Sequence, residues 1–397
     1  MTTNKKPGKW RRRTQAVRAG QVRTSFQETC EPLFFTAGYA YESAEEGEAR
    51  FKGESPGYQY TRLANPTVSM FEARIAALEG APLARATATG MAAVTAVFLG
   101  SLKAGDHVVS ANAVFGSCRY VIESVLPRFG IGCTFVDGTD LGAWAAAMRP
   151  QTKLLFVETP SNPTLSIVDI ACVAKIAHAG GARLIVDNAF ATPALQRPFE
   201  FGADIVVHST TKFIDGQGRA LGGAILCHPD FLEDNLQQFL RNTGPAISPF
   251  NAWLHLKSLE TLELRMRAHC ESAATIADFL AGHGKVARVL YPFRTDHPQH
   301  ALAKKQMSAG GGVVAFEVKG GRNEAFRFAN ALELIDISNH LGDTQSLLTH
   351  PETTTHQKLT PQARAAAGVT SGMVRLSVGL EDVDDLCEDL DSALKAV

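Results

Sequence analysis

Apolar runs alternate with helix-like stretches from Gly80 to about residue 262, and this alternation constrains the fold more than any other feature. Helix-like stretches such as 117–129 and 169–179 separate several strand-like runs. Near-continuous Val, Ile and Leu strands between helices are typical of a mainly parallel sheet with helices on both faces. Ligands of such sheets bind at the carboxyl ends of the strands. The strand-like runs are residues 107–111, 132–136, 153–159, 183–187, 204–208 and 222–227.

The segment before this region has a different character. Residues 1–65 are polar, irregular and glycine-containing, and they predict an arm rather than a domain with its own core. Asn65 and Pro66 then suit the cap and first turn of a helix, and Gly80 suits its end. We therefore expect the large domain to begin at residue 66.

The C-terminal third predicts a second, smaller α+β domain. A long helical stretch near 252–282 leads into it. Strand-like runs follow at 311–318 and 374–379, and an amphipathic helix begins after Glu381. The predicted divisions are an N-terminal arm at 1–65, a large domain at 66–262 and a small domain at 263–397.

Charge and hydropathy exclude several classes of partner. The 397 residues include 39 basic and 40 acidic side chains, a balance that argues against nucleic-acid binding. Apolar runs such as 154–157 are far shorter than the ~20 residues that span a bilayer, so we expect no membrane partner. The N-terminal segment is basic, but no apolar region follows it as in a secretory signal. We therefore expect a solvated or subunit-wrapping arm. Its basic residues are Lys5, Lys6, Lys9 and 11–13.

The cysteine pattern predicts neither a metal site nor a disulfide framework. No two cysteines form a C-x-x-C pair, and an odd number of scattered thiols is typical of a reducing cytoplasm. The seven cysteines are residues 30, 118, 133, 172, 227, 270 and 387.

Candidate functional residues stand at the ends of predicted strands. Asp187 ends one run, Lys212 directly follows the hydroxyl residues 209–211, and Gly90 with Met91 opens a helix. Pyridoxal 5′-phosphate (PLP) needs such a set. Its ring nitrogen requires a carboxylate, its aldehyde requires a lysine for a Schiff base, and its phosphate requires helix N–H groups and hydroxyls. The candidates for these three needs are Asp187, Lys212, and the group Gly90, Met91, Ser209 and Thr211.

Other nucleotide and metal motifs are missing from the sequence. It contains no G-x-x-x-x-G-K-[ST] loop and no H-E-x-x-H pair, and Gly216, Gly218 and Gly222 have the wrong spacing for G-x-G-x-x-G. These observations count against a nucleotide-binding protein, a metalloprotease and a nicotinamide-dependent dehydrogenase.

Several of these segments together carry a family resemblance, which runs from about residue 15 to the end. The sequence resembles the Cys/Met-metabolism family of PLP-dependent enzymes. The resemblance implies the type I PLP fold of the aspartate-aminotransferase kind, with a seven-stranded, mainly parallel sheet and a smaller C-terminal domain. The matching segments are 60–67 (YTRLANPT), 158–163 (ETPSNP), Asp187, 209–212 (STTK) and 374–379 (VRLSVG).

The resemblance also implies residue roles. Lys212 forms the Schiff base and moves protons, Asp187 pairs with the ring nitrogen, and Asn162 lies near the phenolic oxygen. Arg375 binds the substrate carboxylate. Tyr60 and Arg62 reach the phosphate of a neighbouring subunit, so the implied assembly is a homo-oligomer, usually a tetramer built from two dimers with shared active sites. The phosphate contacts are Gly90, Met91, Ser209 and Thr211.

Two departures from the family pattern bear on the substrate. Many members place a tyrosine over the PLP ring, whereas Phe115 stands here and can stack but has no hydroxyl. Ser117 stands where γ-lyases often have cysteine. Carboxylate esters need less acid assistance to leave than thiols do, so Phe115 favours a homoserine ester as substrate.

His340 is a further departure, since relatives have at this position a small polar residue close to the substrate carboxylate. We expect His340 to face the substrate through its backbone, with its imidazole elsewhere. Three stretches are similar to the corresponding stretches of family members that use O-succinylhomoserine and hydrogen sulfide. These stretches are residues 213–223, 338–343 and 349–356.

The implied reaction is γ-replacement, giving homocysteine and succinate in methionine biosynthesis. The sequence does not exclude O-acetylhomoserine as the ester or cysteine as the thiol. Pocket contacts worth only ~1–3 kcal/mol determine which ester and which thiol an enzyme prefers. A binding protein that keeps the fold without catalysis is a further alternative, which the presence of all these candidate residues disfavours.

Overall fold

The computed structural model describes residues 2–3 and 10–397, so Lys5, Lys6 and Lys9 of the expected arm lie outside the described residues. The chain forms two compact units. The first unit comprises Met1–Ser101, Val207–Thr211 and Ala220–Thr261, and the second comprises Leu102–Val206, Lys212–Arg219 and Leu262–Val397. The predicted division at residues 65/66 and 262/263 stays a prediction.

The large sheet has seven strands in the order β3-β9-β8-β7-β6-β4-β5, so the expected seven-stranded sheet is confirmed. Strands β4–β5, β4–β6 and β6–β7 pair in parallel, while β3 pairs antiparallel with β9. β3, of sequence LARAT, was not predicted, because small residues gave it no strong apolar signal. The strands are β3 (Leu83–Thr87), β4 (His107–Ala111), β5 (Gly132–Val136), β6 (Thr152–Glu158), β7 (Arg183–Asp187), β8 (Ile205–Ser209) and β9 (Gly223–Cys227).

Helix α3 (Pro66–Glu79) of the first unit has the predicted ends. The Asn65 side chain accepts hydrogen bonds from the backbone of its first turn, and Gly80 is left-handed with φ of 74°. The expectation of irregular structure before residue 65 was wrong, since α1 (Arg12–Arg18) and α2 (Ala44–Lys52) form there. The other helices of this unit are α4 (Gly90–Ser101), α9 (Pro229–Phe231), α10 (Gln237–Thr243) and α11 (Pro249–Leu259), and a short β2 (Val22–Arg23) pairs with β1 (Thr2–Thr3).

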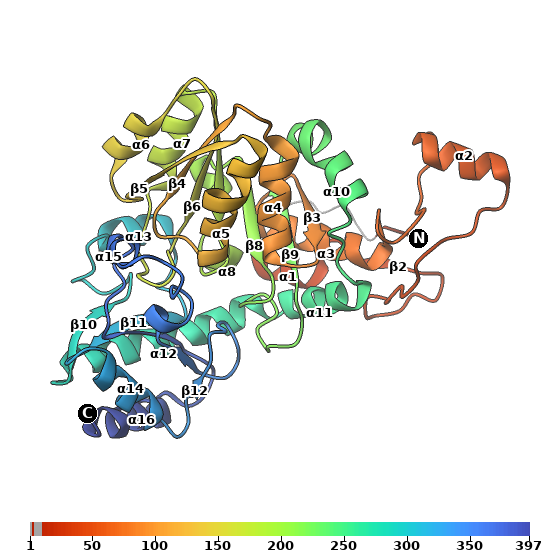
Figure 1. Cartoon of the computed structure of the whole chain (residues 1–397). Coiled ribbons are helices and arrows are strands. Elements are labelled where there is room, and N and C mark those ends of the chain that lie inside the picture. Colours follow the sequence, from red (N-terminus) through yellow and green to blue (C-terminus); the bar gives the residue numbers. More distant parts are fainter. Residues whose placement is uncertain (1, 4–9) are drawn as a thin grey trace. The chain divides into compact units, whose positions relative to one another are not determined.

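The second unit carries helices beside its parallel strands. In Figure 1, α6 (Leu141–Ala147) and α7 (Ile170–Ala179) lie beside β4 and β5. The stretch predicted as one helix near 117–129 is α5 (Gly116–Tyr120) followed by a π turn and a 3₁₀ turn, because Pro127 interrupts regular hydrogen bonding. The stretch near 252–282 is two helices, α11 and α12 (Leu262–Gly282). The unit also contains α8 (Thr192–Leu195), α13 (His300–Gln306), α14 (Arg322–Asn330), α15 (Pro361–Ala366) and α16 (Val383–Lys395).

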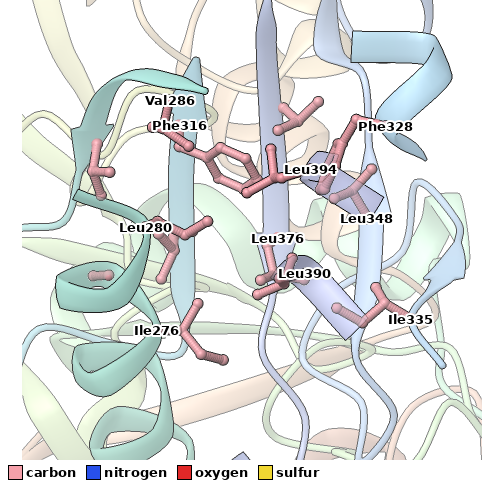
Figure 2. Close-up of a cluster of buried hydrophobic side chains, with 14 of the residues drawn as sticks. Ile276, Leu280, Val286, Phe316, Phe328, Ile335, Leu348, Leu376, Leu390 and Leu394 are labelled. Carbon is pink, nitrogen blue, oxygen red and sulfur yellow. The ribbon is translucent and has the colours of Figure 1, made fainter. Parts of the chain in front are cut away.

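The smaller sheet of the second unit has five strands in the order β10-β11-β14-β13-β12. Helices α12 and α16 pack an apolar face against it, and Figure 2 shows Leu280 of α12 and Leu390 and Leu394 of α16 in this cluster, with Leu390 next to Leu376. The Phe316 and Phe328 rings add an edge-to-face contact with centroids 5.7 Å apart. The strands are β10 (Val286–Leu290), β11 (Val313–Val318), β12 (Asp336–Ile337), β13 (Leu347–Thr349) and β14 (Met373–Ser377).

Within residues 2–3 and 10–397, no helix is long and apolar enough to cross a membrane. The same residues contain no group of three His, Cys, Asp or Glu side chains arranged to hold a metal ion.

Candidate active site

Lys212 lies in the second unit, in the loop that follows β8. Its Nζ is 3.4 Å from Nδ1 of His340. Burial lowers the pKa of Lys212 to about 8, and the nearby positive charge of Arg375 acts in the same direction. An amine with this pKa is partly unprotonated near neutral pH, which a nucleophile and proton acceptor requires.

Arg375 projects from β14 and is almost completely buried. Its Nη1 donates to Oδ1 of Asn162 at 3.0 Å, and its Nη2 donates to the carbonyls of Asn339 and His340 at 3.0 and 3.1 Å. Burial lowers its pKa to about 10, and the acidic Glu158 opposes that shift. Its Nε is buried and has no partner among the described residues, so the guanidinium can still bind an acceptor.

Glu158 and Asp187 lie side by side at the ends of β6 and β7, where they are partners in the strand register. Oε2 of Glu158 accepts a hydrogen bond from the backbone N–H of Phe115 at 2.6 Å. Burial, and then the negative charge of Asp187, raise the pKa of Glu158 well above its ordinary value. Both effects disfavour the charged form of Glu158, which lies directly beside Asp187. Oδ1 of Asp187 also accepts from the backbone of Ala189 at 3.0 Å.

The first unit holds the predicted phosphate-binding residues. Gly90 begins α4, and a Cβ placed on it would be 2.7 Å from the Cβ of Ser209, so only glycine permits this approach. Oγ1 of Thr211 accepts from the backbone N–H of Gly222 at 3.1 Å. Met91 follows Gly90 in the first turn of α4. Helix N–H groups and hydroxyls are thus close together, a combination that suits an anion.

Tyr60 and Arg62 lie on the exposed surface of the first unit. Tyr60 is 46% exposed, and the Arg62 guanidinium lies 5.6 Å from the centre of its ring. Arg62 also donates to the backbone carbonyl of Arg241. Their reach to a neighbouring subunit stays a prediction.

The imidazole of His340 is not where the sequence led us to expect it. The backbone carbonyl of His340 is occupied by Arg375, and the imidazole contacts Lys212 instead of pointing elsewhere. The physical reason is that a buried guanidinium needs acceptors, and the carbonyls of the 339–340 backbone supply two of them.

Two further residues belong to this part of the second unit but were not predicted as site residues. Glu158 is one, and His356 is the other. Burial, with the charge of Arg375, lowers the pKa of His356 to about 4. Both occur in segments that carried the resemblance. The signal for Glu158 was its place at the end of a strand-like run, as for Asp187.

Comparison with known proteins identifies relatives along nearly the whole chain. Residues 13–395 match the family model described as Cys/Met metabolism PLP-dependent enzyme. The chain is 51% identical to an O-succinylhomoserine sulfhydrylase of Mycobacterium tuberculosis, covering 96% of this chain and 95% of that protein. It is 50% identical to an O-succinylhomoserine sulfhydrylase of Pseudomonas aeruginosa, covering 97% and 95%.

A solved structure shows the same fold. A putative O-acetylhomoserine (thiol)-lyase of Campylobacter jejuni superposes with a TM-score of 0.94 at 32% identity, covering 97% of this chain and 100% of that one. That structure contains a pyridoxyl-lysine monophosphate.

Proposed function

Since the chain belongs to the Cys/Met-metabolism family of PLP-dependent enzymes, we propose that it catalyses γ-replacement on O-succinylhomoserine. The nucleophile is hydrogen sulfide, and the products are homocysteine and succinate. The observation that carries this proposal is the 50–51% identity to O-succinylhomoserine sulfhydrylases over almost the full chain.

The residues present fit PLP. Gly90 lets the start of α4 lie directly against Ser209, so the N–H groups of the first helical turn and the Ser209 hydroxyl are close together, as a phosphate requires. The Asp187 carboxylate suits a protonated ring nitrogen, and the raised pKa of its neighbour Glu158 disfavours a second negative charge beside it. Lys212 has an amine able to attach the aldehyde. The residues proposed to hold PLP are Tyr60, Arg62, Gly90, Met91, Phe115, Asn162, Asp187, Ser209, Thr211 and Lys212.

The protein groups then have distinct tasks. When bound, PLP withdraws electrons from the Cα and Cβ atoms of the substrate, which makes their hydrogens acidic. Arg375 binds the substrate α-carboxylate through its planar fork and fixes Cα in place. Lys212 takes the Cα proton and later returns a proton to the product, since its pKa of about 8 suits both directions.

Phe115 supports an ester substrate in particular. Its backbone is held by Glu158, which fixes the place of a ring without a hydroxyl. A thiolate leaving group benefits from a nearby acid, whereas succinate leaves as a stable carboxylate without one. Phe115 therefore restricts the enzyme to substrates that bring a good leaving group.

We also propose a cytoplasmic homotetramer built from dimers. The exposed aromatic side chains Phe26, Phe35 and Phe51, each at least 66% exposed, lie on the same N-terminal segment as Tyr60 and are suited to burial against another subunit. None of the seven cysteines forms a disulfide, as is usual in a reducing compartment. Sedimentation of the purified protein checks the assembly.

A product assay tests the reaction. O-succinylhomoserine and O-acetylhomoserine are each incubated with sulfide and with cysteine, and products are identified by mass spectrometry. We expect homocysteine from the succinyl ester and sulfide with the highest kcat/KM of the four combinations. Cystathionine as the main product would assign a cystathionine synthase instead, and α-ketobutyrate alone would assign a lyase.

A further inference from the structure

His340 is the residue of the second unit whose place the proposed reaction does not yet explain. It lies in the loop between β12 and β13, and the backbone of this loop is fixed at two points. Arg375 binds the carbonyls of Asn339 and His340, and the backbone N–H of Gly342 donates to Oγ of Ser377 at 2.8 Å. The imidazole position is therefore set by β14, a strand of the smaller sheet.

The same loop is packed directly against the chain at Lys212. Gly342 has φ of +77°, and a Cβ on it would lie 2.5 Å from the backbone nitrogen of Phe213. Glycine is needed there because no other residue fits the space or the backbone conformation. This close approach brings the His340 imidazole to 3.4 Å from Nζ of Lys212.

The charges around His340 favour a neutral ring. Burial lowers the pKa of His340, and the positive charges of Lys212 and Arg375 lower it further. Asp343 and Asp215 oppose the shift, but each is already engaged elsewhere, with Thr344 and with Arg219. Nε2 of His340 is buried and has no partner among the described residues. A neutral imidazole can therefore carry its hydrogen on Nε2 and accept a hydrogen bond at Nδ1.

We propose that His340 is a positioning residue for Lys212, whose Nζ–H donates to the neutral Nδ1 of His340. This hydrogen bond holds the amine in one orientation and stabilises its protonated form against the burial that disfavours it. When the bond is broken the amine becomes a better nucleophile, and when it forms again the ammonium has a fixed place from which to return its proton.

The inference rests on the proposed role of Lys212, but its test reads the lysine and not the reaction. The full-length protein is freed of PLP, and the pKa of Lys212 is measured by competitive isotopic acetylation at several pH values. Mass spectrometry of the Lys212 peptide gives the extent of labelling, and the exposed Lys153 serves as internal reference. The result does not depend on which ester or thiol the enzyme uses.

Two variants distinguish a hydrogen-bond acceptor from mere bulk. His340→Ala removes the acceptor and is expected to lower the pKa of Lys212 by about one unit. His340→Asn places an amide oxygen near the position of Nδ1 and is expected to recover most of that shift. Should the alanine variant fail to fold, His340→Leu against His340→Asn makes the same comparison. An unchanged or raised Lys212 pKa in the alanine or leucine variant overturns the proposal, as does an asparagine variant that behaves like them.

Discussion

Strand β14 has two faces that differ sharply in chemistry. On one face, Val374 and Leu376 join an apolar cluster under α12 and α16. On the other, Arg375 binds Asn162, and Ser377 accepts from the loop that carries His340. Because successive side chains of a strand point to opposite faces, residues of the apolar core alternate along β14 with residues of the candidate site.

The difference between the faces is energetic as well as chemical. Each large apolar side chain gains about 1.5–3 kcal/mol from burial. On the polar face, burial instead disfavours the charged forms, lowering the pKa of Lys212 to about 8 and that of Arg375 to about 10. The apolar face therefore contributes stability, whereas burial of the charged site residues lowers it. Such shifted pKa values are expected where groups take part in catalysis.

Among substitutions at the candidate site, removal of the Lys212 amine is expected to lower activity the most. We expect Lys212→Ala to lower γ-replacement activity by at least about 10³-fold, because both attachment of PLP and proton transfer are lost. Steady-state homocysteine formation measures the change, and circular dichroism controls for the fold. Activity within tenfold of the wild type would move the chemistry to another residue.

Leu390 is the position chosen to destabilise the apolar face, because its side chain is fully buried in the cluster of Figure 2. Leu390→Ala is expected to lower the free energy of unfolding by about 3 kcal/mol while leaving kcat unchanged well below the melting temperature. Urea denaturation measures the loss. Leu390→Met, which conserves volume, serves as control and should lose less than about 1.5 kcal/mol. A kcat that falls with the alanine variant at low temperature would show that the two faces are coupled.

Arg375→Lys keeps the charge of the polar face but removes the fork. We expect kcat/KM to fall about 100-fold, mainly through KM, because lysine cannot bind a carboxylate with two parallel hydrogen bonds. The matched control is Arg327→Lys on α14, an exposed residue paired with Glu324. If KM stays within threefold for Arg375→Lys, the substrate carboxylate binds elsewhere.

Lys212→Met tests the energetic cost of the polar face in protein freed of PLP. Because the pKa of Lys212 is lowered from 10.5 to about 8, the folded state binds fewer protons than the unfolded state between these values. Wild-type stability should therefore rise with pH across that window, and the variant should lack this gain. We expect the variant to be more stable by about 3 kcal/mol at pH 7, with the difference vanishing above pH 10.5. Urea midpoints at matched pH measure it, and a wild type more stable than the variant at pH 7 would contradict it.

The smallest effect is expected at Glu158. Because burial and Asp187 raise its pKa, the neutral form of Glu158 is favoured, and Glu158→Gln replaces that form with a neutral amide. Activity at pH 7 should stay within about threefold, since the glutamine oxygen still accepts from Phe115. Asp187→Asn is the matched comparison and should lose far more. Equal losses from the two variants would mean that both carboxylates are charged.

Local patterns in the sequence predicted much of this architecture. Apolar runs located six strands of the large sheet to within about two residues, and Asn65 with Gly80 marked both ends of α3. Helix α2 was missed although Ser43 caps it and Gly53 ends it, because its few apolar residues show no helical periodicity. The edge strand β3 was missed for a similar reason.

Site residues that belong to a short continuous motif could be predicted from the sequence. Contacts that depend on the order of the strands in the sheet could not. The segment 209–212 indicated Lys212 when it was taken together with Asp187 and with Gly90 and Met91. The pairing of Glu158 with Asp187 arises because β6 lies next to β7, and sequence spacing does not reveal that neighbour. The contact of His340 with Lys212 spans 128 residues and depends on how Arg375 fixes the loop backbone.

The most direct test of the account is to locate the cofactor on the chain. The purified enzyme with PLP bound is reduced with borohydride, digested, and searched by mass spectrometry for a pyridoxyl-modified lysine. The account predicts one modified peptide, containing residues 209–212, with the pyridoxyl group on Lys212. A pyridoxyl group on any other lysine, or none after reduction of protein that binds PLP, would contradict it.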